Sequence, residues 1–472
     1  MDPQPQKLNA TPDGLLLDAS RLGLVTDLYE LTMAAAYWSA GLADRSATFE
    51  LFFRSLPASR SFMVAAGLEQ ALYYLMNVRF ADDDIRYLRG LAIFAHAPAA
   101  WFESLCEWRF TGDVWAIPEG TIVFPNEPLL RVTAPLAEAQ IVETYLLTTL
   151  AYQSSVATKA ARVCTAARGR GVVDFGTRRG HGPQAGMWAA RAAFIGGCVG
   201  TSNVAAAERL GIPPLGTLAH SFIMAIEDER EAFESFAAVF PDRPTFLIDT
   251  FDTLEGARNA LRTLHRPGQV RLDSGDLAAL SREVRRVLDE GGAPDVKIFA
   301  SGDLNEYKID ALVAGGAPID AFGVGTELTT VADAPSLGCV YKLVEVAGGS
   351  GGEAGETGRI KLSAGKRTYP GRKQVFQHLG PDGRFDRDII GLADEQLPGE
   401  RLLEQVMRDG QLVGPTPGLG SLQERCRTQL GRVSTELLAI DGHTTYPVEM
   451  SDALEAEFQR VARAKERHGG TK

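Results

Sequence analysis

Cysteine is scarce in this chain, with five residues among 472. They are odd in number, lie far apart and form no Cys-X-X-Cys pair, so the sequence excludes a disulfide framework. This pattern is typical of a reducing compartment, and we expect a cytoplasmic location. The residues are Cys106, Cys164, Cys198, Cys339 and Cys426.

Long apolar runs and an excess of positive charge are also missing. The first residues, MDPQPQKLNATPDG, carry no apolar signal-peptide core, and the apolar stretch at 186–197 is interrupted by Arg191. We therefore expect a soluble, unexported protein with no membrane partner. The net charge of −12 argues against a nucleic-acid partner, because neutralising phosphates needs a basic face. Any anionic ligand must meet a local basic pocket instead.

The chain is long enough to bury more than one core, and we divide it into a tail and three parts. A polar tail covers residues 1–20. An N-terminal β-rich domain follows at 21–138, with a helix that begins near Thr26 or Asp27, where Thr-Asp supplies an N-cap. Residues 346–472 form a glycine-rich linker and a smaller C-terminal region.

Residues 139–345 open with a long helix and then alternate short β-like runs with helical stretches. Each run ends in polar and glycine residues. This rhythm predicts an α/β fold, a parallel barrel whose chemistry lies at the carboxyl ends of its strands. The expected runs are VVDFG, GTLAHS, TFLIDT, QVRLDS, VKIFAS, IDAFGVG and CVYKLVEV.

Several of these strand ends carry residues suited to an anionic ligand. SGD at 301–303 and GVGT at 323–326 resemble phosphate cradles, because glycine lets backbone N–H groups approach an anion. Tight turns are the alternative interpretation of both. Arg178 and Arg179 offer forked donors for phosphate, or are simply solvated. Arg271 and Asp273 alternate along one strand and point into one pocket, or form a surface ion pair.

His220 follows the apolar run at 216–219, which predicts a strand-end histidine that faces a cavity. Such a histidine serves as a base, a ligand or a nucleophile, and a structural histidine is the alternative.

Taken in order, these motifs resemble the nicotinate phosphoribosyltransferase family. The match runs from residue 26 to about 376 through the segments 26–38, 174–184, 200–212, 216–222, 270–277, 323–330, 335–346 and 368–376. The resemblance implies a type II phosphoribosyltransferase, with a β-rich N-terminal domain packed on an irregular α/β barrel. It also implies the reaction in which nicotinate, phosphoribosyl pyrophosphate, ATP and water give nicotinate mononucleotide, pyrophosphate, ADP and phosphate. This reaction is the entry step of NAD salvage from nicotinate.

The resemblance further implies roles for individual residues. His220 accepts the γ-phosphoryl group of ATP, and a carboxylate orients it, with Asp249 as the candidate and Asp252 as the alternative. Mg²⁺ is expected to arrive bound to substrate phosphates, because no carboxylate cluster with ligand spacing is visible. The nicotinate site is expected to comprise Tyr29, Phe175, Ser202, Thr217 and Arg271. The phosphoribosyl pyrophosphate site is expected to comprise Arg178, Asp273, Gly302, Gly325 and Thr326.

Two of these residues bear on substrate choice and assembly. Nicotinamide enzymes of this fold have a carboxylate at the position of Ser202, whereas a hydroxyl donates to the nicotinate carboxylate. In the family, the tyrosine that matches Tyr29 reaches the active site of the other subunit, so a homodimer with shared sites is implied. A quinolinate phosphoribosyltransferase and a non-catalytic mononucleotide-binding relative are the alternatives. The intact GTLAHSF motif and phosphate cradles argue against both.

Overall fold

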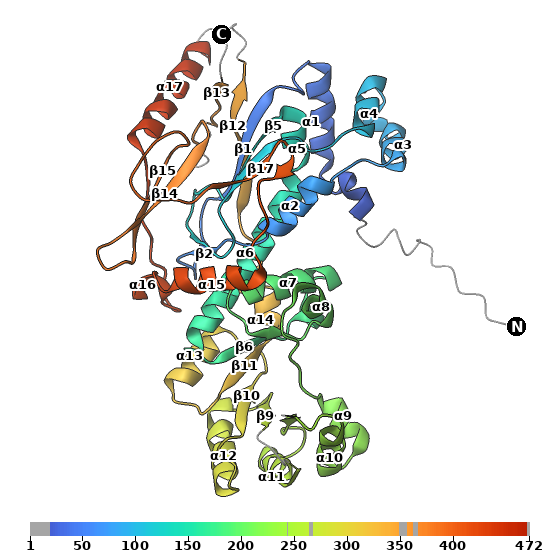
Figure 1. Ribbon diagram of the computed structural model, residues 1–472, viewed down its shortest axis with the longest axis vertical. Helices are drawn as coiled ribbons and strands as arrows, with labels where there is room; N and C mark the ends of the chain where they lie inside the picture. The colour runs from blue at the N-terminus through green and yellow to red at the C-terminus, as the bar shows by residue number, and fades with distance from the viewer. Residues whose placement is uncertain (1–18, 243, 264–267, 349–355, 362–366, 470–472) are drawn as a thin grey trace, which may run out of the picture.

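A computed structural model describes residues 19–242, 244–263, 268–348, 356–361 and 367–469. The molecule is elongated, with a β-rich part at one end and the parallel sheet at the other (Figure 1). Nearly all of the expected polar tail, most of the glycine-rich linker and the last three residues lie outside the described part. No helix in the described ranges is long and apolar enough to cross a membrane.

The β-rich part is built on a seven-stranded sheet in the order β13-β12-β1-β5-β3-β17-β18. β1 is an interior strand of this sheet, buried at seven of its eight positions, and pairs antiparallel with both β12 and β5. A short β2–β4 ladder, Met63–Val64 with Ile122–Val123, lies beside it. The strands are β1 (Ser46–Phe53), β3 (Asp113–Ala116), β5 (Leu130–Pro135), β12 (Cys339–Ala347), β13 (Glu356–Gly358), β17 (Glu404–Arg408) and β18 (Gln411–Leu412).

The run CVYKLVEV was expected in the barrel, and this assignment is wrong. It forms β12, which pairs with β1 of the N-terminal sheet, and Tyr341 on β12 stacks on Phe49 of β1. Strands β17 and β18 from the C-terminal region also join this sheet. The chain therefore returns twice to its N-terminal part after leaving the barrel.

Helices cover this sheet and connect it to the barrel. The first helix, α1, begins at Leu28 as expected, but Asp27 makes no side-chain cap. Its carboxylate accepts from Thr144 instead, because α6 packs against this turn. The expected long helix is interrupted at Val142, which separates α5 from α6. These elements are α1 (Leu28–Ser39), α2 (Leu68–Asn77), α3 (Asp82–Gly90), α4 (Ala99–Cys106), α5 (Leu136–Ile141) and α6 (Glu143–Ala166), with 3-10 turns η2 (Ala19–Leu24) and η3 (Ala92–Phe94).

Within the described residues, six parallel strands form the barrel sheet in the order β7-β6-β11-β10-β9-β8. The strands are β6 (Gly171–Asp174), β7 (Gly200–Thr201), β8 (Thr245–Leu247), β9 (Gln269–Leu272), β10 (Lys297–Ala300) and β11 (Ala321–Val324). The associated helices are η4 (Thr177–Arg179), α7 (Pro183–Ile195), α8 (Val204–Leu210), α9 (His220–Ile226), α10 (Glu229–Val239), α11 (Thr253–Thr263), α12 (Leu277–Glu290), α13 (Glu306–Ala314) and α14 (Thr326–Thr329).

The sheet is curled and its two edges, β7 and β8, are not paired with each other. The run GTLAHS was expected to be a strand, but residues 215–219 form none, and His220 is the first residue of α9. The irregular α/β barrel is thus confirmed, whereas the strand-end position of His220 is wrong. The run resembles a strand because of its short apolar stretch, but residues 215–219 pair with no strand and lead directly into α9.

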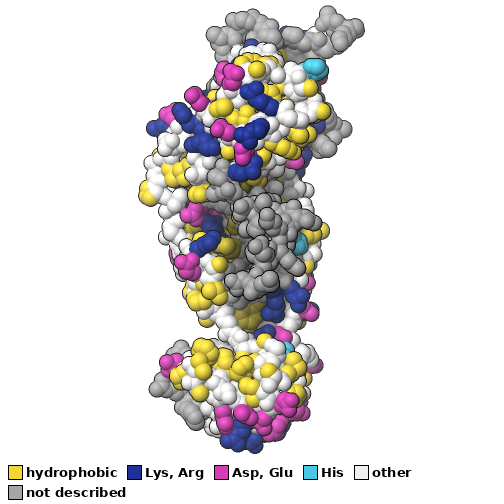
Figure 2. Space-filling model, turned by 90° about the vertical axis from the view of Figure 1, so that its right-hand side faces the viewer, with side chains coloured by type: hydrophobic (Ala, Val, Ile, Leu, Met, Phe, Trp, Pro, Cys, Tyr) yellow, Lys and Arg dark blue, Asp and Glu magenta, His cyan; other side chains and the backbone are white. Residues whose placement is uncertain are grey.

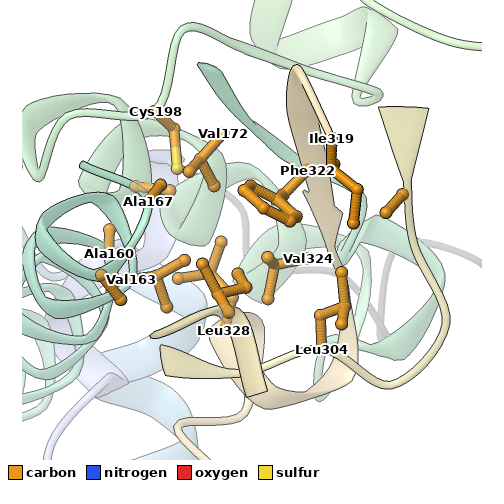
Figure 3. Packing of buried hydrophobic residues seen from close by; sticks show 14 of the residues in the cluster. Ala160, Val163, Ala167, Val172, Cys198, Leu304, Ile319, Phe322, Val324 and Leu328 are labelled. Carbon is orange, nitrogen blue, oxygen red and sulfur yellow. The ribbon is translucent and has the colours of Figure 1, made fainter. Parts of the chain in front are cut away.

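Small residues bring α6 close to the barrel core. Figure 3 shows Ala160 and Val163 of α6 beside Val172, Phe322 and Val324 of β6 and β11. A side chain at Gly196, after α7, would lie 2.3 Å from the carbonyl oxygen of Ala157, so α7 also contacts α6 backbone to backbone. α6 therefore connects the β-rich end of the molecule to the barrel (Figure 1).

The C-terminal region adds a four-stranded sheet in the order β16-β14-β15-β19. Its helix α15 bridges the two ends, because Gln423 donates to the carbonyl oxygens of Phe194 and Cys198. The elements are β14 (Lys373–Leu379), β15 (Phe385–Leu392), β16 (Glu400–Arg401), β19 (Val448–Met450), α15 (Leu419–Leu430), α16 (Thr435–Leu438) and α17 (Asp452–Gly469).

Candidate active site

A network of short hydrogen bonds joins the carboxyl ends of the barrel strands. Arg271, the third residue of β9, donates to Thr217 at 2.6 Å, to Ser301 at 2.7 Å and to Asp273 at 2.6 Å. Ser301 in turn donates to Asp273. Arg271 and Asp273 thus lie on the same side of the strand, as the alternation around Leu272 predicts, and are paired within a partly buried network rather than on the open surface.

Asp273 is held as a carboxylate by this network. Burial opposes its ionisation, but the Ser301 hydrogen bond and the Arg271 charge together keep the pKa of Asp273 below its ordinary value. The group therefore accepts hydrogen bonds throughout the physiological pH range. Such a carboxylate suits the hydroxyl groups of a sugar.

His220 lies on the rim of this network, with 39% of its side chain exposed. Its Nδ1 atom is 3.1 Å from Oγ1 of Thr250, and its Nε2 atom is 3.7 Å from Oδ2 of Asp273. One ring nitrogen is held by a neutral hydroxyl, while the other faces the Asp273 carboxylate. The imidazole is therefore oriented and reachable.

The two carboxylates considered as orienting groups for His220 are bonded elsewhere. Asp249 accepts from the backbone N–H of Asp273 and from Ser274, at 2.8 and 2.7 Å. Asp252 accepts from backbone N–H groups at the start of α11. Thr250, between them, is the group in contact with His220, and a hydroxyl after a strand carried no signal that sequence reasoning recognised.

An aromatic surface borders the same pocket. Phe175 follows β6, and the guanidinium of Arg271 lies 5.5 Å from its ring centre. A side chain at Gly323 would lie 2.6 Å from the Phe175 ring, so glycine in β11 leaves room for that ring. Phe175 and Thr217 thus both contact Arg271, and these three of the expected nicotinate residues are together.

Ser202 stands one residue beyond β7, on the far edge of the sheet from β8. Its side chain is exposed, and its N–H donates to the carbonyl oxygen of Asp174 at 2.9 Å. Asp174 itself was not singled out from the sequence. It is buried, accepts from Thr201 and from Gly176, and burial raises its pKa. Asp174 therefore fixes the turn that carries Ser202 and Phe175.

Of the two expected phosphate cradles, the one at Gly302 has a backbone geometry that requires glycine. Gly302 has φ +98°, and a side chain there would lie 2.0 Å from the carbonyl oxygen of Asp273. Gly325 caps α14, whose first residue, Thr326, is exposed. Both loops leave adjacent strands, β10 and β11. They are therefore neighbours at one edge of the pocket.

Arg178 and Tyr29 stand apart from this network. Arg178 lies exposed on η4, and among the described residues no hydrogen bond or ion pair is formed by its side chain. Tyr29 is 48% exposed on α1, at the opposite end of the molecule from β9 and α9 (Figure 1). Tyr29 cannot reach His220 of its own chain.

Exposed apolar side chains gather beside His220. Figure 2 shows them on the lobe formed by α9 and α10. They include Phe222, Met224, Val239 and Phe240. Large exposed apolar residues that cluster in this way are typical of an interaction surface.

Three family models match the chain. The N-terminal domain of nicotinate phosphoribosyltransferase matches residues 24–151, and the C-terminal domain of the same enzyme matches 399–457. The C-terminal domain of quinolinate phosphoribosyl transferase matches the barrel, residues 156–334. The fold and these matches define a type II phosphoribosyltransferase.

Individual relatives narrow this class. The chain is 46% identical over 458 residues to a nicotinate phosphoribosyltransferase of Mycobacterium tuberculosis, covering 95% of this chain and 96% of the relative. It is 40% identical to that of Bacillus subtilis, covering 94% and 96%. The crystal structure of human nicotinic acid phosphoribosyltransferase superposes with a TM-score of 0.81 at 31% identity, covering 93% of this chain and all of that one. The chain belongs to the nicotinate phosphoribosyltransferase family.

Proposed function

We propose that this chain makes nicotinate mononucleotide and pyrophosphate from nicotinate and phosphoribosyl pyrophosphate, and couples the reaction to ATP hydrolysis through a phosphohistidine at His220. Such a reaction is the first step of NAD salvage from nicotinate. The observation that carries the proposal is the pocket itself: an oriented, exposed imidazole beside an Arg271–Asp273–Ser301 network and two glycine cradles. Family membership supplies the substrates.

In the phosphoryl step, Nε2 of His220 attacks the γ-phosphorus of ATP. If Nδ1–H donates to Thr250, the lone pair of Nε2 is free for this attack. Nε2 lies on the side of the ring that faces Asp273. The Nε2–P bond forms as the bond from phosphorus to the bridging oxygen breaks, and ADP leaves with that electron pair. Asp273 then lies close enough to stabilise the positive charge that develops on the ring.

In the transfer step, the ring nitrogen of nicotinate attacks C1 of the sugar as pyrophosphate leaves. The centre is oxocarbenium-like, so the protein mainly orients the reactants and stabilises charge. Phe175 offers a face for the pyridine ring, and Arg271 and Thr217 offer donors for its carboxylate. Asp273 would hold the ribose hydroxyls. The 5′-phosphate would be bound by Gly302, Gly325 and Thr326. Arg178 would contact the ligand anions.

Water then attacks the phosphorus, the Nε2–P bond breaks with its electron pair returning to His220, and phosphate leaves. ATP hydrolysis in this way serves to drive the transfer towards the mononucleotide. Every ~1.4 kcal/mol of free energy from ATP hydrolysis that is coupled to the transfer shifts the transfer equilibrium about tenfold towards the mononucleotide. Mg²⁺, bound through substrate phosphates, would neutralise their charge. Asp249 would be the carboxylate that fits it, since its Oδ1 atom is buried without a hydrogen-bond partner.

We further propose a homodimer with shared sites in the cytoplasm. The position of Tyr29, exposed and remote from its own His220, supports a role in the pocket of a second copy. The apolar lobe at α9 and α10 would supply area for that contact.

The test is a transfer assay with purified protein and phosphoribosyl pyrophosphate, in which nicotinate, nicotinamide and quinolinate are compared with and without ATP. We expect mononucleotide from nicotinate, with ATP raising the yield and being hydrolysed. Turnover of quinolinate with release of carbon dioxide, or a yield that ATP does not change, would contradict the proposal.

A further inference from the structure

The two phosphate cradles continue directly into a buried group of charges. The loop with Gly302 leads to Glu306, the first residue of α13. The loop with Gly325 leads through Glu327 to Asp333. These three carboxylates meet the side chains of Lys159, Arg60 and Arg162. We call these six residues the cradle ion network.

Lys159, on α6, is the centre of the network and is fully buried. Its Nζ atom lies 2.6 Å from Glu306, 2.9 Å from Asp333 and 3.8 Å from Glu327. A single ammonium group therefore joins a carboxylate that follows one cradle to a carboxylate that follows the other. This bridge adds a side-chain connection between two loops that already follow paired strands, β10 and β11.

Two arginines complete the network and balance its charge. Arg60, 1% exposed, bonds both oxygens of Asp333 at 2.8 and 3.2 Å. Arg162 donates to Glu306 at 3.1 Å. Although burial opposes it, the hydrogen bonds and charges of Arg60 and Lys159 hold the pKa of Asp333 well below its ordinary value. Three cations face three carboxylates.

The loops that the network holds are strained. Val331, buried between Gly325 and Asp333, has φ +47°, and Asp303, next to Gly302, has φ +46°. A β-branched residue with positive φ is energetically unfavourable and persists only where its surroundings enforce it. Tyr152 of α6 adds a second tie, because its hydroxyl donates to the carbonyl oxygen of Thr329 at 3.0 Å.

Stability alone is a poor reason for such a cluster. Buried ion pairs seldom stabilise a protein more than well-packed apolar side chains would, because each charge must be desolvated. An ion bridge between two loops fixes their relative position. Apolar contacts restrict that position less, because they are not directional. Strained loops held by buried charges are what a rigid binding site needs.

We propose that Lys159 and Asp333 are positioning residues for the sugar phosphate: they set the separation of the Gly302 and Gly325 cradles and so determine the affinity for phosphoribosyl pyrophosphate. This inference rests on the proposed function, because the cradles are assigned to that substrate there.

The test compares Asp333→Asn with Glu119→Gln. Both changes are isosteric. Glu119 forms a matched buried pair with Arg191, at 2.7 Å, away from the cradles. We expect Asp333→Asn to raise KM for phosphoribosyl pyrophosphate roughly 10- to 100-fold. Its KM for nicotinate should change less than about twofold and its labelling by ATP alone should persist. Glu119→Gln should lower the melting temperature without changing either KM.

A charge-balanced second variant, Lys159→Met with Glu306→Gln, separates position from stability. We expect it to melt close to the wild type and still to have a raised KM for phosphoribosyl pyrophosphate. Equal shifts of both KM values, or a normal KM for phosphoribosyl pyrophosphate in folded Asp333→Asn, would overturn the inference. Wild-type protein that transfers no phosphoribosyl group would instead contradict the proposed function, so the two failures are distinguishable.

Discussion

The Nδ1 atom of His220 lies 3.1 Å from the Oγ1 atom of Thr250, a residue of the turn between β8 and α11. The histidine is therefore oriented by a neutral hydroxyl rather than by a carboxylate. This contact engages Nδ1 and leaves Nε2, which lies 3.7 Å from Oδ2 of Asp273, as the ring nitrogen available to attack a phosphoryl group.

Replacing Thr250 by Val should slow labelling of the protein by γ-labelled ATP about 5- to 10-fold, the equivalent of one lost hydrogen bond. Thr250→Ser keeps the hydroxyl and should behave like the wild type. Single-turnover labelling measures both. Equal rates in the Val and Ser variants would mean that this contact does not orient the nucleophile.

Ser202→Asp should change the choice of pyridine. A carboxylate near the acid group of nicotinate costs roughly 2 to 4 kcal/mol in transition-state binding, so kcat/KM for nicotinate should fall about 30- to 1,000-fold. Nicotinamide use should fall less or rise, because its amide donates to the new carboxylate. The readout is the ratio of the two kcat/KM values, with folding checked by thermal melting. An unchanged ratio would direct the search to Arg178, Thr217 and Arg271.

If active sites are shared between subunits, mixing two inactive variants should restore some transferase activity. Tyr29→Ala and Arg271→Ala should each be nearly inactive, but a heterodimer of the two has one intact site. The mixture should regain part of the wild-type activity after subunits exchange. No recovery, with exchange demonstrated by mass spectrometry of tagged chains, would show that Tyr29 acts within its own subunit.

The burial of Glu30 should make the free energy of unfolding depend on pH. It is fully buried beside Tyr29 and accepts from Gln140, and burial raises its pKa from 4.5 to about 7. The unfolded chain ionises first as pH rises, so the contribution of Glu30 to folding is complete below about pH 4.5 and is lost as pH rises through 7. Wild-type stability relative to Glu30→Gln should therefore fall by on the order of 3 kcal/mol between pH 4.5 and 7.5.

Urea denaturation of wild type and Glu30→Gln at several pH values measures this difference. The Gln variant has the same shape and no titration, so it removes all other pH effects from the comparison. A difference that stays constant across this range would contradict the assignment.

Local pattern was enough to predict β6, β8, β9, β10 and β11 and the residues at their ends, although it missed β7 and added two runs that are not barrel strands. Glycine and acidic residues after β9, β10 and β11 could be recognised because the carboxyl ends of parallel strands share one edge. The pairing of Arg271 with Asp273 followed from strand alternation in the same way. These features depend on neighbours in the sequence.

What could not be predicted depends on contacts between distant segments. The run that forms β12 has the composition of a barrel strand, and only its pairing with β1 assigns it to the other sheet. The contacts of Thr250 with His220 and of Lys159 with Glu306 join residues 30 and 147 positions apart along the chain. Neither a lone threonine nor a lone lysine on an apolar helix carries a signal of such a role.

The most direct test of the account is the chemical state of His220 after exposure to ATP. Protein incubated with γ-labelled ATP and Mg²⁺ is digested, and the labelled peptide is identified by mass spectrometry. We predict one acid-labile, alkali-stable phosphoryl group on His220 of the wild type and none on His220→Ala, which should also lose ATP-stimulated transfer. An unlabelled wild type that still couples ATP hydrolysis to transfer, or an equal acid-labile label on His220→Ala, would contradict the account.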